Sequence, residues 1–456
     1  MIPEQFQHLA ATVAATVDAL RAKERLKCGI ITYFRRMPKE FAYTDQGVET
    51  RDSVISVFKR RDWSAIVGEI LPEIQNCEEY NACRSFCLTT ASGNTNVDIA
   101  LEHVAARLIR LIVAARTSAW ERQFPRLFRR FLIIVREGPS PKSVKVELRG
   151  LIMGSPLLRF TSERARIFIR PSNRNDLTIE MRSDDAVHFA TSHCPRRNDY
   201  PSAILRISLA RACPRQLQQA VEEAIAILRL FRLAGIEYIR YRMISPSDTF
   251  FGEEISEARY PLEGQGSYTI CPADSRRLRL FWKGMSGPVK QSLLRDAPRR
   301  IESSATAFGF YNEALRGHDH HKKTAFAIMG LEALLLPGAD GELSYRFGTR
   351  LAKLLGLCGG DPHRIRRLAK LGYSVRSAFA HGGHLSREDK KKIDKEGGVG
   401  VVATQVLDYL RRIIVTVLTF GDTRDNLIAL LDESLVDSRK DAEIRSKLRQ
   451  AISLLG

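Results

Sequence analysis

Apolar side chains recur at three- and four-residue spacing in the first part of the chain, and this pattern predicts helices. One predicted helix covers residues 5–22 and another covers residues 96–118. In the second, one face is formed by Val97, Leu101, Val104, Leu108 and Ile112. Residues 1–140 are therefore expected to form a mainly helical N-terminal segment.

The spacing changes from helical to alternating after Pro141. Val144, Val146 and Leu148 alternate with charged residues, which predicts a half-buried strand. Similar alternating runs occur at residues 165–169, 177–181, 203–209 and 236–244. An amphipathic helix is predicted over residues 217–231, with Gly235 at its C-cap. Residues 141–245 are thus expected to form a small α+β middle domain with a mainly antiparallel sheet.

Residues 246–286 are rich in Gly, Pro and Ser and show weak periodicity. They are therefore predicted to be a linker or an irregular connection that Trp282 pins in part. Only helical patterns follow. They cover residues 287–315, 320–336, 342–357, 362–381, 399–420, 423–435 and 438–454. Because the connections between them are short, residues 287–456 are expected to form an antiparallel helical bundle. The predicted fold class is α+β and multidomain.

Composition and charge narrow the class of protein. The chain has 456 residues, of which 44% are hydrophobic and 27% charged, and this balance excludes intrinsic disorder. The formal net charge of +19 favours a polyanionic partner, either nucleic acid or an anionic membrane face. No apolar run approaches the roughly 20 residues that cross a bilayer. Glu4 and the absence of a basic leader predict a cytoplasmic protein without a membrane partner.

Motifs for metals and cofactors are missing from the sequence. The eight cysteines are expected to be reduced thiols, because the one cluster, Cys77, Cys83 and Cys87, fits no zinc spacing. His318, His320 and His321 form the densest histidine group, but Asp319 between them is a good helix N-cap. No phosphate-binding loop or dinucleotide fingerprint occurs. We therefore expect no cofactor and no metal site.

The most informative motif lies at the end of a predicted bundle helix, where Arg376 and His381 precede Gly382-Gly383. The spacing alone is not specific, because the pairs Arg316/His321 and Arg182/His188 show similar spacings. The surrounding sequence is what discriminates between them.

That surrounding sequence resembles an ApeA-like HEPN domain over residues 290–440, about a third of the chain. The matching segments are Ala327-Ile-Met-Gly-Leu-Glu332-Ala-Leu-Leu, Tyr345-Arg346-Phe-Gly-Thr-Arg350-Leu-Ala, Tyr373-Ser-Val-Arg376-Ser377 through His381-Gly382, and Leu407-Asp-Tyr-Leu-Arg411-Arg412. The resemblance implies an all-α bundle, a homodimer and a metal-independent endoribonuclease, often one that serves in defence. It also implies that Arg376 and His381 are catalytic, with Glu332, Tyr373 and Ser377 in support. Many active HEPN nucleases carry Asn, Asp or His at the position of Ser377.

The chemistry suits these residue types. Cleavage of RNA by its own 2′-hydroxyl requires a proton acceptor or donor near neutral pH, which histidine supplies. It also requires a fixed cation beside the phosphate, which arginine supplies. The product would be a 2′,3′-cyclic phosphate. Weaker RNA contacts are expected from the basic residues of the same helix, Arg364, Arg366, Arg367 and Lys370.

Geometry limits how one chain uses this pair. Residues five positions apart on a helix point about 140° apart around its axis. Either the helix ends at Gly382-Gly383 and frees His381, or two chains pair and form a composite site in a homodimer. In the alternative structural interpretation, Arg376 bonds to a neighbouring helix through Glu332, and His381 only caps a helix end. Glu332 itself is a buried partner of Arg350 or Arg376, or an ordinary surface acid.

The resemblance therefore implies an RNA-cleaving anti-phage effector. In this interpretation the residues before 286 sense a trigger, derived from phage or nucleic acid, and restrain the bundle. The alternative is a non-catalytic HEPN protein that binds nucleic acid or scaffolds a partner. A DNA-binding regulator is disfavoured because no helix-turn-helix pattern stands out.

Overall fold

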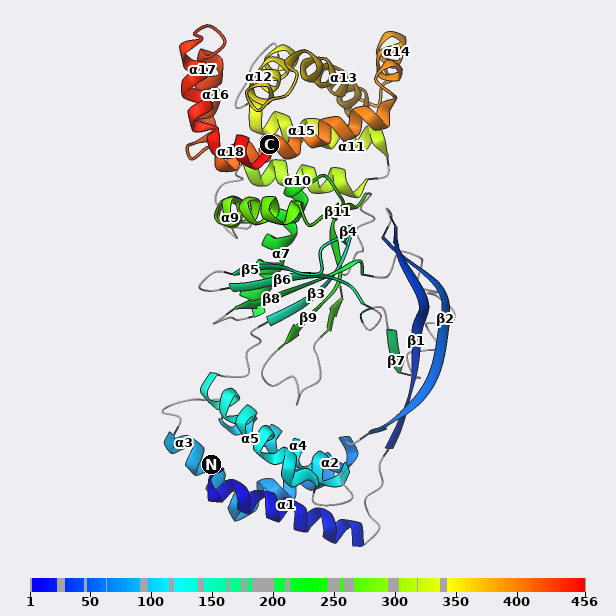
Figure 1. Ribbon diagram of the computed structural model, residues 1–456, viewed down its shortest axis with the longest axis vertical. Helices are drawn as coiled ribbons and strands as arrows, with labels where there is room; N and C mark the ends of the chain where they lie inside the picture. The colour runs from blue at the N-terminus through cyan, green and yellow to red at the C-terminus, as the bar shows by residue number, and fades with distance from the viewer. Residues whose placement is uncertain are drawn as a thin grey trace.

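The computed structural model describes residues 2–22, 29–44, 47–62, 64–90, 97–114, 119–137, 143–161, 165–173, 176, 179–182, 201–209, 214–244, 255–257, 266–293, 303–317, 319–336 and 343–455. The described chain is mostly helical and contains a small antiparallel sheet, as expected for the α+β class. Figure 1 shows helices at both ends and the sheets between them.

The N-terminal helices pack around a core of their own. Their bounds are α1 (Glu4–Ala22), α2 (Ser64–Gln75), α3 (Glu78–Thr90), α4 (Val97–Ala114) and α5 (Ala119–Glu137). Phe6 of α1 is fully buried, and its ring centroid lies 4.8 Å from that of Phe128 and 5.0 Å from that of Phe131 in α5. The predicted face of α4 is confirmed, since Leu101, Val104 and Leu108 are fully buried in this core.

A long hairpin inside this segment was not predicted. Strands β1 (Gly29–Thr44) and β2 (Gly47–Asp62) pair antiparallel, from Gly29 opposite Asp62 to Thr44 opposite Gly47. The expectation of a mainly helical residues 1–140 is therefore wrong for residues 29–62. Residues 30–34, Ile-Ile-Thr-Tyr-Phe, have the β-branched and aromatic composition of strands. They lack two-residue alternation, so periodicity does not predict a strand here.

The middle of the chain contains a six-stranded antiparallel sheet in the order β10-β9-β3-β8-β6-β5. Its strands are β3 (Ser143–Arg149), β5 (Leu158–Thr161), β6 (Ala165–Pro171), β8 (Ala203–Leu209), β9 (Glu237–Ile244) and β10 (Ile255–Glu257). Helix α7 (Pro214–Phe231) packs on one face of this sheet. The predicted strands near 144–148, 165–169, 203–209 and 236–244 are confirmed, as is the predicted helix.

Two details of the middle region differ from the prediction. The strand expected near 177–181 is β7 (Ile179–Arg182), and it pairs with β1 rather than with the six-stranded sheet. Gly235 is not the C-cap of α7, which ends at Phe231. Gly235 lies instead where two loops approach closely, since a Cβ on Gly150 would lie 2.9 Å from the Gly235 carbonyl oxygen.

The predicted linker, residues 246–286, contains regular structure. Strand β11 (Tyr268–Ile270) pairs in parallel with β4 (Leu151–Met153), and α9 (Asp274–Ser292) begins well before residue 287. Asp274 opens α9 and pairs with Arg232, which favours a helix start that the Gly- and Ser-rich composition concealed. The role expected of Trp282 is confirmed, since its buried ring stacks on Phe160 of β5 at 4.5 Å.

The bundle is helical throughout its described part. Its further helices are α10 (Ser303–Arg316), α11 (His320–Leu335), α12 (Leu343–Leu357), α13 (Pro362–Ala380), α14 (Arg387–Lys395), α15 (Val399–Thr419), α16 (Arg424–Glu433), α17 (Arg439–Lys447) and α18 (Arg449–Leu455). Helix α14 was not predicted. Helices α11 and α15 pack closely at Gly330, where a Cβ would lie 2.7 Å from a methyl carbon of Leu410.

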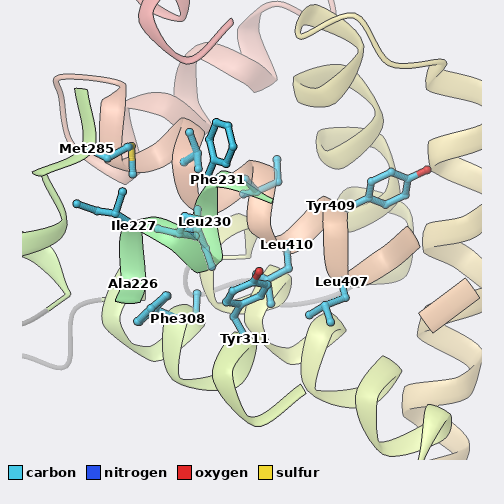
Figure 2. Packing of buried hydrophobic residues seen from close by; sticks show 14 of the residues in the cluster. Ala226, Ile227, Leu230, Phe231, Met285, Phe308, Tyr311, Leu407, Tyr409 and Leu410 are labelled. Carbon is cyan, nitrogen blue, oxygen red and sulfur yellow. The ribbon is translucent and has the colours of Figure 1, made fainter. Parts of the chain in front are cut away.

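One hydrophobic core joins the bundle to the middle sheet. Figure 2 shows Leu230 of α7 close to Leu410 of α15 and Tyr311 of α10, with Ile227 of α7 on the side of Met285 of α9, and all five are buried. In this arrangement α7 lies between the sheet and the bundle and contributes to the interior of both.

Polar contacts reinforce this junction at the C-terminal end of α7, whose last carbonyls have no partners within the helix. The hydroxyl of Tyr268 donates to Leu228 O (2.9 Å), and the hydroxyl of Tyr311 donates to Arg229 O (2.8 Å). Arg411 Nη1 of α15 donates to Leu230 O (2.8 Å) and to Phe231 O (3.1 Å). Side chains from β11, α10 and α15 thus satisfy four consecutive carbonyls.

Within the described part of the chain, no helix combines the length and the apolar character that crossing a membrane requires. Cys77, Cys83 and Cys87 are thiols that form no disulfide. Burial raises the pKa of Cys83 to about 12 and that of Cys87 to about 11, so both are protonated side chains of the N-terminal core.

Candidate functional site

Helix α13 carries the predicted site and is defined at both ends by local sequence. Its N-cap Asp361 accepts a hydrogen bond from the backbone N–H of His363 (3.0 Å), and Pro362 occupies the first turn. The helix contacts α11, α12, α14 and α15. Its apolar face is buried through Ile365, Leu368, Ala369, Leu371 and Val375. Residues near its C-terminal end are therefore held by a rigid scaffold.

The end of α13 agrees with the prediction. The helix stops at Ala380, His381 is the C-cap, and Gly382 adopts a left-handed conformation (φ +62°). The N–H of Gly383 donates to Ala378 O (2.9 Å), which completes a Schellman motif. The His381 side chain is exposed at this turn. An imidazole placed there has free access to a ligand in solution.

Arg376 points to a neighbouring helix. Its Nη2 lies 3.4 Å from Glu332 Oε2 of α11, with the two side chains 28% and 17% exposed. Burial raises the pKa of Glu332, and the positive charge of Arg376 opposes that rise. The Nε atom of Arg376 is buried and donates to no acceptor among the described residues. The guanidinium therefore has a charge partner but retains unused donor capacity.

The choice of partner for Glu332 is now resolved in favour of Arg376 over Arg350. Arg350 is 4% exposed at its side chain and instead bonds to Asp432 of α16 at 2.8 and 2.6 Å. Its Nη1 also donates to Leu335 O at 2.6 Å, at the end of α11. Both geometric parts of the alternative interpretation are thus present, namely the Arg376–Glu332 pair and His381 at a helix end.

Ser377 and Tyr373, the other predicted supporting residues, lie on the same helix with different surroundings. Ser377 is partly exposed, and its carbonyl accepts the N–H of His381 (3.1 Å). Tyr373 is partly buried, with its ring centroid 6.1 Å from that of Phe347 in α12. Because α13 stays helical as far as Ala380, Arg376 faces α11 whereas His381 sits at the exposed end.

The four predicted RNA contacts lie on the exposed side of α13. Arg367 is largely neutralised, since its Nε lies 2.6 Å from Glu396 Oε1. Arg366 lies over the ring of Tyr345 in α12, 5.2 Å from the ring centroid. Among the described residues, no ion pair involves Arg364 or Lys370. This surface is basic, but less so than the sequence alone indicates.

Two features near the site were missed by sequence reasoning. Helix α14 begins at N-cap Ser386, whose hydroxyl accepts the N–H of Asp389 (3.0 Å), and it carries several lysines. The Ser386-x-x-Asp389 spacing is the signal that predicts this helix start. Phe379 of α13 is 45% exposed, between Arg376 and His381 in sequence. An exposed aromatic residue there has no sequence signature.

The histidine group behaves as a helix start. Asp319 is the N-cap of α11 and accepts from the N–H groups of His321 (2.7 Å) and Lys322 (3.4 Å). His318 lies outside the described residues. Across the described ranges, no group of three or more His, Cys, Asp or Glu side chains is placed to hold a metal ion.

Comparison of the chain with protein-family models, with curated proteins and with solved structures found no match.

Proposed function

We propose that the protein is a metal-independent endoribonuclease of the HEPN type, acting in the cytoplasm as an anti-phage effector. The residues before 286 serve in this proposal as a sensor or regulator of the bundle. The observation that carries the proposal is the end of α13, where an exposed histidine and an arginine with an unused buried donor stand five residues apart. The order of the bundle helices around this end supports it.

Each residue has a defined role in the proposed reaction. The 2′-oxygen of a ribose attacks the adjacent phosphorus, and the bond from phosphorus to the 5′-oxygen of the next nucleotide breaks. His381 moves the proton, either from the 2′-hydroxyl or to the leaving 5′-oxygen. Arg376 donates to the phosphate oxygens as negative charge builds up on them. The products are a 2′,3′-cyclic phosphate and a 5′-hydroxyl.

A homodimer resolves the separation of the two side chains. In one chain Arg376 is directed toward Glu332 while His381 lies at the helix end, so a phosphate between two copies of α13 has access to one residue from each. The exposed Phe379 supports this pairing, because dimerisation through this end of α13 would remove its ring from water.

Cleavage of labelled single-stranded RNA and transfer RNA by the full chain, in excess EDTA, tests the proposal. Wild type is compared with Arg376→Ala and His381→Ala. The matched controls are His363→Ala and Arg387→Ala, which remove exposed side chains of the same types from α13 and α14. We expect cutting in EDTA by wild type and both controls, and none by the two site variants. Cutting retained in both site variants, or lost on chelation, would contradict the proposal.

The alternative is a non-catalytic HEPN protein that binds RNA or scaffolds a partner. The specific observation in its favour is that Arg376 is paired with Glu332 and His381 is a C-cap, so both have structural roles without any reaction. Tight RNA binding by wild type, without cutting, would favour this alternative.

A further inference from the structure

The six-stranded sheet has one face covered by α7 and a second face rich in basic residues. Val144, Val146, Leu205 and Ile207 point to the α7 side and are fully buried. Side chains on the opposite face fall into rows, because directly paired residues of neighbouring strands point the same way. One row, from β9 to β5, consists of Arg242, Lys145, Arg206, Phe168 and Arg159.

Phe168 is surrounded by arginines on this face. Arg206 of β8 and Arg159 of β5 are its direct cross-strand partners. Arg166 and Arg170 stand two residues before and after it on β6, and therefore on the same face. The Arg159 guanidinium carbon lies 5.9 Å from the centroid of the Phe168 ring. An aromatic ring thus has an arginine neighbour in each of four directions.

The arginines differ in how they are neutralised. Arg170 bonds to the buried Asp176 at 2.6 and 3.1 Å, and Lys145 bonds to the same carboxylate at 2.9 Å. Arg159, Arg166 and Arg206 are exposed, and no carboxylate of the described residues lies within ion-pair distance of any of them. The charges of Lys145 and Arg170 are therefore offset by the buried Asp176 carboxylate. The positive charges of the three exposed arginines are not offset in this way.

We propose that Arg159, Arg166, Phe168 and Arg206, together called the sheet face, bind single-stranded RNA. Phosphates contact the three arginines, and an unstacked base packs on the Phe168 ring. The Phe168 ring stands on the surface of a β-sheet, so a base reaches it only when that base is not paired within a duplex. The three exposed cations supply the electrostatic part of the affinity.

This site is separate from the one on α13. The sheet face lies on the side of the sheet away from α7, and α7 separates the sheet from the bundle (Figure 1). RNA binding at the sheet face therefore does not depend on the proposed cleavage chemistry. It gives the middle region a function of its own, the capture of a single strand.

Fluorescence anisotropy with a labelled 20-nucleotide RNA of mixed sequence tests the proposal. All proteins carry His381→Ala, so that the probe stays intact. The test variant combines Arg159→Gln, Arg166→Gln and Arg206→Gln. The control combines Arg276→Gln, Arg279→Gln and Arg449→Gln, which remove the same charge from exposed positions of α9 and α18.

We expect the sheet-face triple variant to bind RNA at least about tenfold more weakly than the background protein. The slope of log K against log salt should decrease in magnitude by about 2, because each of the three lost phosphate contacts accounts for roughly 0.7. The control should lose less than about twofold. Equal losses in both variants would show only the attraction of net charge and would overturn the proposal. So would a loss of binding to phosphatidylserine vesicles in the triple variant with unchanged RNA affinity.

Phe168→Leu tests the stacking step. We expect at least about fivefold weaker binding of the single strand, and restored affinity in Phe168→Tyr, which keeps an aromatic face. Circular dichroism confirms that each variant is folded. Unchanged affinity in folded Phe168→Leu would overturn the stacking assignment. Because binding is measured in the His381→Ala background, in which no cutting is expected, the result is independent of whether the cleavage proposal holds.

Discussion

Arg376 of α13 and Glu332 of α11 form an ion pair that is more than two-thirds shielded from water on both sides, with Nη2 and Oε2 3.4 Å apart. This contact holds the guanidinium against the bundle interior. It also means that the arginine proposed to bind phosphate has a stabilising partner when RNA is absent. The two roles can be separated by measurement.

The first prediction concerns pH. Burial raises the pKa of Glu332 above the ordinary 4.5, so the folded state holds this proton more tightly than the unfolded state. Its contribution to stability is complete below pH 4.5 and is lost as the pH rises through the raised pKa. Glu332→Gln removes this dependence, so its free energy of unfolding relative to wild type should increase between pH 4.5 and 7. Urea unfolding of both proteins across this pH range measures the difference in free energy of unfolding. A difference that stays constant or decreases with pH would contradict a raised pKa at Glu332.

The second prediction separates stability from activity at the two proposed catalytic residues. Arg376→Ala leaves the partly buried Glu332 without a partner and should lower the free energy of unfolding by about 2 kcal/mol. His381→Ala changes an exposed side chain and should stay within about 0.5 kcal/mol of wild type. Denaturant unfolding at pH 7 compares them. Equal effects would mean that His381 has a structural contact of its own.

The third prediction concerns the turn after α13. Gly382→Ala places a side chain at φ +62° and should cost about 1 kcal/mol. Gly383→Ala is the matched control, because Gly383 is not among the glycines with positive φ and a Cβ there meets nothing within 4 Å. Thermal unfolding of both variants tests this. If both are equally stable, the left-handed turn is not what ends the helix.

The fourth prediction concerns the junction at α7. Tyr311→Phe keeps the buried ring but removes the donor to Arg229 O, and should cost about 1 to 2 kcal/mol. Tyr345→Phe, at a side chain 60% exposed, is the control and should have almost no effect. A Tyr311→Phe protein as stable as wild type would show that the hydroxyl contributes little at this position.

The fifth prediction concerns the proposed dimer. Light scattering should find a species of twice the chain's 51.4 kDa at micromolar concentration. Phe379→Asp should shift it to the monomer, because the exposed ring lies at the proposed contact. Val436→Asp, at a side chain 90% exposed on another part of the bundle, should leave the dimer intact. A monomeric wild type would remove the basis for a composite site.

The ends of α13 were predictable from the sequence because their signals are local. Asp361 followed by Pro362, and His381 followed by Gly382, are the residue types that caps require. The partner of Glu332 was not predictable. Arg350 and Arg376 both lie on helices next to α11, and only the packing decides which of them faces the carboxylate.

The errors in the fold prediction have a common physical origin. The pairing of β1 with β2, and of β7 with β1, depends on contacts between distant segments rather than on local periodicity. The start of α9 was hidden because Asp274 is stabilised by Arg232, a residue far away in sequence. Helix α14 differs from these cases, because its Ser386 cap is a local signal that could have been used.

The capped C-terminal end of α7 has a consequence for dissecting the protein. A fragment beginning at residue 287 would lack the strand and helix that fill one side of the bundle, so Tyr311, Leu410 and Arg411 would face water. Such a fragment should be insoluble or poorly folded. The middle sheet and the bundle should also melt in one cooperative transition, and a protease should not release either as a stable piece.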